Sequence, residues 1–97
     1  MNSDQIKERL LQIAEPQEEF SVVLSGKASK KANGLYKPEE REIVLHNKNF
    51  SNDNLLIYTA IHEYAHHLHF CSSDPPKSAR SHTRRFWSIL HSLLGKA

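Results

Sequence analysis

Cysteine and long apolar runs are what this 97-residue chain has least of. Its one cysteine, Cys71, can form no disulfide within the chain, which agrees with a reducing compartment. No stretch approaches the roughly 20 apolar residues that a membrane-spanning helix needs, and the polar N-terminus does not resemble a signal peptide. These absences predict a cytoplasmic protein that does not associate with membranes.

Size and composition limit the organisation of the chain. The formal net charge is only +2, and the 38% hydrophobic and 25% charged residues are typical of a soluble globular protein. The length leaves room for one domain, residues 1–97, with a small core. We find no internal repeat and no coiled-coil heptad.

The most informative segment is His62-Glu63-Tyr64-Ala65-His66, an HExxH pentapeptide. On an α-helix, histidines four residues apart are separated by about 40° around the axis and about 6 Å along it, so both can reach one metal ion. The glutamate between them lies beside that ion, where it can take a proton from a water whose pKa zinc lowers to about 7. The motif therefore predicts a zinc hydrolase with His62 and His66 as ligands and Glu63 as general base.

The pentapeptide lies in a segment with the apolar spacing of a helix that faces a core. One apolar stripe, spanning about 100° of the helical wheel, is formed by Ile57, Ile61, Tyr64, Ala65 and Leu68. The two histidine ligands lie on a neighbouring stripe, at the edge of that core. Candidate N-caps at positions 51–53 and a Ser/Pro-rich cluster at 72–76 predict a helix over Asn52–Phe70.

A catalytic zinc site normally has three protein ligands and an open position. His82 is the best third candidate, because Ser81–Leu94 has the pattern of a second amphipathic helix and His82 shares its buried stripe, facing inward from the first turn. His69 lies roughly 10 Å along the helix from His62, too far to join both other ligands. We expect it to line the cleft or to contact solvent.

The other histidines receive lesser roles. His67 and His91 are expected at the surface. His46, at the end of a predicted strand, is the reserve candidate for a ligand or for a hydrogen-bond partner of one. Cys71 is a weaker reserve. The residue that stabilises the oxyanion is left open among five candidates, namely Tyr36, Tyr58, Tyr64, His91 and Arg84.

The remainder of the chain predicts a helix and a short sheet. Apolar spacing over Asp4–Glu15 indicates an N-terminal helix, with Ser3 or Asp4 as its cap and Pro16 ending it. Phe20–Leu24 and Arg41–His46 are predicted strands, and Leu35 with Tyr36 can pair with the latter as a hairpin. Residues 26–34, rich in lysine, glycine and asparagine, are expected to form a mobile loop. An exposed strand just before the HExxH helix could hold an extended peptide.

Two segments together resemble a known family. The pairing of the HExxH motif with Ser81-His82-Thr83-Arg84-Arg85-Phe86-Trp87 is similar to the small HExxH proteins of the SprT-like and YgjP-like (WLM) group of zincin metallopeptidases. In that group a third histidine opens a following helix and precedes an aromatic pair, here Phe86-Trp87. This chain departs from the pattern at Thr83, where glycine or serine is common, and in the two prolines between the second and third histidines.

The resemblance covers roughly residues 35 to 94 and implies both a fold and an activity. The implied fold is a minimal α+β zincin-like one, with an N-terminal helix, a short antiparallel or mixed sheet, the HExxH helix and a C-terminal helix. The implied activity is that of a metallopeptidase acting on peptides or proteins, with Zn²⁺ held by His62, His66 and His82 and with Glu63 as general base.

Two clusters of positive residues leave other functions open. Lys27, Lys30 and Lys31 form one cluster, and the second, near the expected third ligand, consists of Lys77, Arg80, Arg84 and Arg85. A basic rim could attract acidic peptides or nucleic acid. The alternatives are therefore a nucleic-acid-associated metallohydrolase on the same scaffold and a module that binds zinc structurally, with Cys71 or His46 closing the fourth position.

Overall fold

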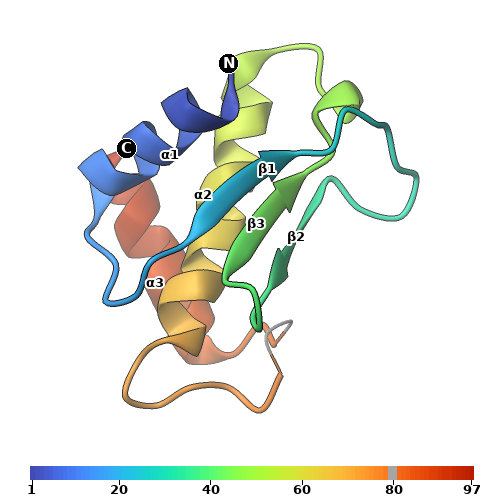
Figure 1. The fold of residues 1–97 in the computed structure, drawn as a ribbon. Coiled ribbons are helices and arrows are strands. Elements are labelled where there is room, and N and C mark those ends of the chain that lie inside the picture. The colour runs from blue at the N-terminus through green and yellow to red at the C-terminus, as the bar shows by residue number, and fades with distance from the viewer. Residues whose placement is uncertain (79–80) are drawn as a thin grey trace.

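The computed structural model describes residues 1–78 and 81–97, which form three helices and one small sheet (Figure 1). The elements in chain order are α1 (Ser3–Ile13), β1 (Ser21–Leu24), β2 (Gly34–Lys37), β3 (Glu42–Leu45), the 3-10 turn η1 (Asn47–Asn49), α2 (Asp53–Phe70) and α3 (Arg84–Lys96). This is the expected α+β architecture. β1 and β3 lie within the predicted strands, and β2 extends one residue beyond each end of the predicted Leu35–Tyr36 pair.

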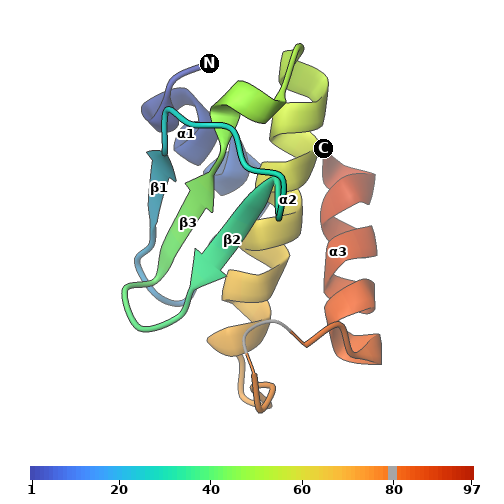
Figure 2. The ribbon, with the colours of Figure 1, turned by 90° about the vertical axis from the view of Figure 1, so that its right-hand side faces the viewer.

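The sheet is mixed, with strand order β1-β3-β2. β1 runs parallel to β3, whereas β2 forms an antiparallel hairpin with β3 and leaves its other side open. In Figure 2, α2 lies between the sheet and α3, so one side of this helix packs on the strands and another on the last helix. α1 packs against β1 and α2.

One hydrophobic cluster joins all the helices and strands. Its buried members are Ile6, Leu10, Ile13, Phe20, Val22, Tyr36, Ile43, Leu45, Leu56, Ala60, Ile61, Tyr64, Ala65, Phe86, Leu90 and Leu93. The Tyr64 hydroxyl donates to the carbonyl of Ala14 at 2.6 Å and so ties the middle of α2 to the end of α1. The HExxH segment is therefore held from two sides within the best-packed part of the molecule.

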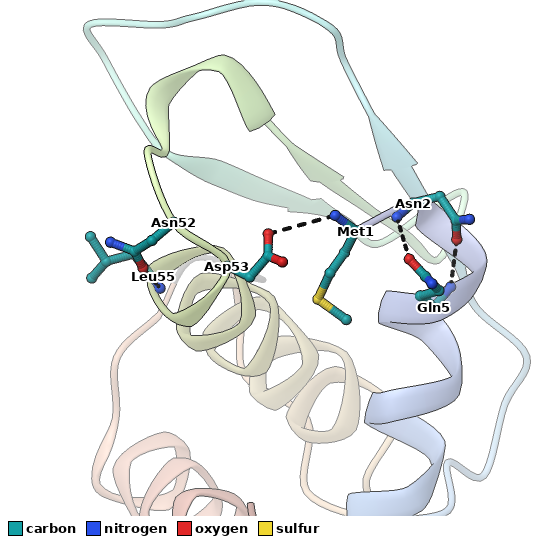
Figure 3. Close-up of polar contacts among 6 residues, drawn as sticks. All are labelled: Met1, Asn2, Gln5, Asn52, Asp53 and Leu55. Atoms are coloured by element: carbon teal, nitrogen blue, oxygen red, sulfur yellow. Dashed lines mark hydrogen bonds and ion pairs between the residues drawn. The ribbon is translucent and has the colours of Figure 1, made fainter.

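The start of α1 differs from the prediction. Its N-cap is Asn2, rather than Ser3 or Asp4, and the helix ends at Ile13 rather than Glu15. The Asn2 side chain accepts a hydrogen bond from the Gln5 N–H at 2.8 Å, and the Gln5 side chain accepts one from the Asn2 N–H at 3.0 Å (Figure 3). This reciprocal pair fixes the cap, because a residue at position 3 or 4 would have Ile6 or Lys7 three places on, and neither side chain can accept that bond.

α2 begins where it was predicted. The Asn52 side chain caps it by accepting the Leu55 N–H at 3.0 Å. Asp53, in the first turn, lies 3.6 Å from the Met1 amine and so brings the beginnings of α1 and α2 together (Figure 3).

α3 begins later than predicted, which changes the place of His82. The Thr83 hydroxyl caps the helix by accepting the Phe86 N–H at 3.2 Å, so Arg84 rather than Ser81 is the first helical residue. His82 therefore precedes the cap and is an exposed residue outside the helix, not an inward-facing member of its first turn. A threonine that satisfies an unpaired N–H stops the helix from extending further towards the N-terminus.

The loop between β1 and β2 is tied to η1, although the sequence predicted a mobile segment. The Asn49 side chain accepts the Ser29 N–H and donates to the Ser29 carbonyl, both at 2.8 Å, and to the Asn33 side chain at 2.9 Å. The Asn47 side chain accepts the Gly26 N–H at 2.8 Å. These bonds attach the loop to η1, the turn that follows β3.

β2 approaches α2 most closely at Gly34. A Cβ placed there would lie 2.9 Å from the Val44 carbonyl oxygen and 3.3 Å from Cγ2 of Thr59. We expect Gly34→Ala to lower the free energy of unfolding by about 1–3 kcal/mol, since the added methyl must displace the strand. Gly95→Ala is the matched control, because nothing lies within 4 Å of its Cβ position, and should leave stability unchanged or raise it by up to about 1 kcal/mol. Urea unfolding measures both, and equal stability of the two variants would contradict the close approach.

Candidate metal centre

Three histidines from two parts of the chain meet beside α2. His62 and His66, one helical turn apart, have ring centroids 5.2 Å from each other, and the His82 ring lies 5.4 Å from the first and 4.9 Å from the second. Each offers one ring nitrogen, and these three atoms all lie within 4.8 Å of one another. The expected ligand set is therefore brought together in space, and it could hold a metal ion.

A single buried ring supports this cluster. Phe86, from the first turn of α3, is completely buried, and its ring centroid lies 5.1, 4.2 and 4.9 Å from those of His62, His66 and His82. The exposed ring of Trp87 lies 5.7 Å from that of His82. The aromatic pair that follows the third histidine thus positions it, even though His82 lies outside the helix.

Burial favours the neutral form of the two α2 histidines. The pKa of His66 is lowered to about 3, mainly by burial and then by charge repulsion from the neighbouring rings of His62, His82 and His69. Burial, followed by the His82 charge, also lowers the pKa of His62. A neutral imidazole has a free lone pair, so near pH 7 these two residues need not lose a proton before they bind a metal ion.

Glu63 is a nearly buried carboxyl group without a protein partner. Only 7% of the residue is exposed, and burial raises its pKa to about 7. No hydrogen bond or ion pair links its side chain to any other residue within 1–78 and 81–97. An unpaired buried carboxylate is costly, so a cation held by the adjacent histidines would fit this site, and the imidazole-rich donor set suits zinc among divalent ions.

The cluster opens on a cavity of about 530 Å³. The walls are the loop before β2, the β2 strand and the metal-centre residues, namely Ser29, Lys31, Ala32, Gly34, Leu35, Tyr36, His46, His62, Glu63, His66 and His82. A smaller cavity of about 200 Å³ beside it is shared by Asn33, Tyr58 and Thr59 with His62 and Glu63. We call the larger space the metal-centre cleft.

His67, which the sequence placed at the surface, is completely buried. Its Nε2–H donates to the Glu18 carbonyl at 3.0 Å, so its Nδ1 is left to accept from the Tyr36 hydroxyl at 2.7 Å. Burial lowers the pKa of His67, which agrees with a neutral ring. The prediction was wrong because the helical wheel shows only α2, whereas the segment between α1 and β1 covers this side of the helix.

His69 is also buried, with only 2% of the residue exposed, whereas the sequence allowed it to contact solvent. Its Nδ1 has no hydrogen-bond partner among the described residues. It does not belong to the histidine group that could hold a metal ion, as its distance along the helix predicted. Burial, and then the charge of Arg85, lowers the pKa of this ring.

The two reserve residues and His91 lie in three different places. His46 lines the metal-centre cleft, and its Nδ1 lies 3.0 Å from the Ser25 hydroxyl. Cys71 is a free thiol, and its sulfur lies 3.8 Å from Nδ1 of His67, the nitrogen that also accepts from Tyr36. His91 is exposed, as predicted, with its ring 6.3 Å from that of Trp87.

The basic clusters lie mostly at the exposed surface. Lys31 belongs to the wall of the metal-centre cleft, while Lys77, Arg84 and Arg85 are exposed. Arg80, also assigned to the second cluster, lies outside the described residues. Within 1–78 and 81–97, no helix has the length and apolar character needed to cross a membrane.

The hydrogen bond between Tyr36 and His67 makes a testable contribution to stability. We expect Tyr36→Phe to lower the free energy of unfolding by about 1–2 kcal/mol, because it leaves Nδ1 of a buried ring with only the weak donor of the Cys71 thiol at 3.8 Å. Tyr58→Phe is the matched control, since Tyr58 is 47% exposed, and should change stability by less than about 0.5 kcal/mol. Denaturant unfolding of both variants checks this, and equal losses would show that the Tyr36 bond contributes nothing.

The raised pKa of Glu63 predicts a pH-dependent effect in metal-free protein. Because the folded carboxyl keeps its proton up to about pH 7 and the unfolded one only to its ordinary 4.5, ionisation favours unfolding as the pH rises through that window. Glu63→Gln should therefore match the parent protein near pH 4 and exceed its stability increasingly up to about pH 7, with a constant margin above. Thermal unfolding with chelator present measures the margin. Exposed Glu39→Gln is the control, and a margin that does not vary with pH would refute the cause.

Comparison with known proteins adds no family assignment. No family model matches the chain, and searches of curated proteins and of solved structures find no significant match. The resemblance to the small HExxH metallopeptidases therefore rests on the two sequence motifs alone.

Proposed function

We propose that this protein is a zinc-dependent metallopeptidase that hydrolyses peptide bonds, with Zn²⁺ bound by His62, His66 and His82. The observation that carries the proposal is the meeting of these three side chains with the unpaired Glu63 carboxyl in one open cleft. Three ligands leave one position free, which is the arrangement of catalytic rather than structural zinc sites.

The chemistry divides between the ion and the chain. Zinc, when bound, would polarise the peptide carbonyl and lower the pKa of water to about 7. Glu63 would take a proton from the attacking water and deliver it to the leaving amine. This carboxyl belongs to the HExxH helix and lines the cleft with the three histidines, which is where a general base is needed.

The open side of β2 supplies a way to hold the substrate. Asn33 and His46 form a hydrogen-bonded pair, since the Asn33 carbonyl accepts the His46 N–H at 2.9 Å. Hydrogen-bonded and non-hydrogen-bonded residue pairs alternate along an antiparallel pair of strands. Counting from Asn33↔His46, the pairs Gly34↔Leu45 and Tyr36↔Ile43 are therefore non-hydrogen-bonded. The backbone N–H and C=O groups of Gly34 and Tyr36 therefore point away from β3.

Both of these residues also line the metal-centre cleft. An extended peptide could add to β2 as a further strand, which would bring one of its peptide bonds past Glu63 and the three histidines. This edge favours a polypeptide substrate over a nucleic acid, because it offers backbone hydrogen bonds, and Lys31 is the single cationic side chain among the described residues of the wall.

A purely structural role for zinc has less support. Such a site needs a fourth protein ligand, yet within 1–78 and 81–97 neither reserve residue, Cys71 or His46, belongs to the group of mutually close ligand atoms. We also keep a cytoplasmic location as part of the proposal, because the thiol of Cys71 is free.

Metal analysis combined with digestion of labelled casein tests this function. The purified protein should bind about one zinc per chain and cleave casein until chelator is added. Glu63→Gln should retain zinc and lose about 10²–10⁴-fold in rate, whereas His82→Ala should lose zinc as well.

His91→Ala is the matched control for the histidine change, because His91 is exposed and lies outside the cleft; it should keep both zinc and activity. Protein without stoichiometric metal, or cleavage that survives Glu63→Gln, would refute the proposal. Metal-dependent cleavage of RNA or DNA without peptide cleavage would favour the nucleic-acid alternative.

A further inference from the structure

His46 lies at the end of the central strand, in the wall of the metal-centre cleft. It directly follows β3, and its N–H is held by the Asn33 carbonyl at 2.9 Å. The residue is partly buried and shares the cavity with Glu63 and the three metal-binding histidines. It does not belong to the ligand group itself, so its side chain is available for a different task in the same cleft.

Ser25 lies where it can fix which nitrogen of His46 carries the hydrogen. The Ser25 hydroxyl accepts the Lys27 N–H at 3.2 Å, and its own hydrogen can go to Nδ1 of His46 at 3.0 Å or to the Lys27 carbonyl at 3.5 Å. A hydroxyl hydrogen directed along the 3.0 Å contact makes Nδ1 the acceptor, and a neutral ring then carries its hydrogen on Nε2.

The same contact leaves Nε2 unpaired on the other side of the ring. Ser25 continues from β1, because its N–H donates to the Leu45 carbonyl at 2.9 Å, while the cleft lies on the β2 side of β3. The two nitrogens are on opposite sides of an imidazole ring, so Nδ1 facing Ser25 leaves Nε2 facing the other way. Nε2 has no hydrogen-bond partner among the described residues.

The other donors near the cleft are already engaged or unfixed. The Tyr36 hydroxyl donates to His67, and that of Tyr64 donates to the Ala14 carbonyl. Tyr58 and Lys31 are exposed side chains, and no hydrogen bond holds either side-chain end in place. Among the described histidines and tyrosines of the cleft wall, His46 is therefore the one that has a held ring and an unpaired ring nitrogen and is neither a ligand nor the base. The Ser29 hydroxyl, which accepts the Lys31 N–H at 3.2 Å, is the other held group of the wall with a hydrogen to donate.

We propose that His46 is a further catalytic residue: its Nε2–H donates a hydrogen bond to the carbonyl oxygen of the peptide bond under attack, and Ser25 is the positioning residue that keeps the hydrogen there. This inference rests on the proposed peptidase function. A preorganised donor of this kind stabilises the negative charge that develops on the oxygen.

Kinetics on labelled casein test the role of His46. His46→Ala should lower kcat by about 10²–10³-fold, with KM and zinc content close to those of the parent protein. His46→Gln should recover at least about tenfold of that loss, because its side-chain amide can place an N–H near the position of Nε2. Ser25→Ala should show a smaller loss than His46→Ala, and exposed His91→Ala should show none.

A second measurement does not depend on activity. Long-range nitrogen–proton correlation spectra of labelled, metal-free protein report the tautomer of each histidine, and His46→Gln assigns the signals. We expect the Nε2–H tautomer for His46, and in Ser25→Ala we expect a mixture of tautomers. The spectra of the variants also establish that each one is folded.

The outcomes separate this inference from the proposed function. An active protein whose kcat is unchanged in His46→Ala, or whose His46 carries its hydrogen on Nδ1, overturns the inference and leaves the peptidase proposal standing. A large kcat loss in Tyr58→Phe or Lys31→Ala with none in His46→Ala assigns the donor elsewhere and also overturns it. A parent protein that binds zinc but cleaves no casein overturns both.

Discussion

The contact of Phe86 with three imidazole rings is the constraint on which the rest of this site depends. Two histidines are placed by the regular spacing of one helix, but the third lies on an exposed stretch of chain with no helix of its own. Its ring is held because the buried Phe86, capped into position by Thr83, lies beneath all three. Packing between α2 and α3 therefore determines the geometry of the ligand set.

Burial has opposite effects on the two kinds of titratable group in the cleft. It favours neutral histidines, which is the state that binds metal ions, and it favours a protonated Glu63, which is the state that a base must leave. A divalent cation at this site would use the lone pairs of the neutral imidazoles and would attract the carboxylate charge. Its binding would then offset the cost of ionising the buried Glu63, so metal affinity and stability would be coupled.

The sequence was sufficient for features that depend on local pattern. The HExxH helix, with Asn52 as one of three candidate caps, and the three strands follow from spacing and turn residues. The need for one more ligand pointed to His82, which does lie beside His62 and His66, although the helical position expected for it was wrong. The start of α3 was missed because Thr83 competes as a cap, and Asn2 was missed because a capping box is recognised only when both of its partners are considered.

Tertiary cover explains the remaining differences. His67 faces a side of α2 that a helical wheel leaves open, and only the chain between α1 and β1, brought there by the fold, buries it. The orientation of His46 likewise depends on Ser25, which is 21 positions away in sequence and adjacent only because β1 pairs with β3. No one-dimensional pattern contains either relation.

The single side chain of Asn49 has a consequence for how this fold can diversify. It binds the loop of residues 29–33 at several points, yet it comes from a turn that contributes nothing to the ligand set. Because Ser29, Lys31 and Ala32 line the cleft, changes within that loop would alter the shape of one cleft wall and leave the residues of the hydrophobic core unchanged. The shape of the cleft and the packing of the core therefore depend on different parts of a very small molecule.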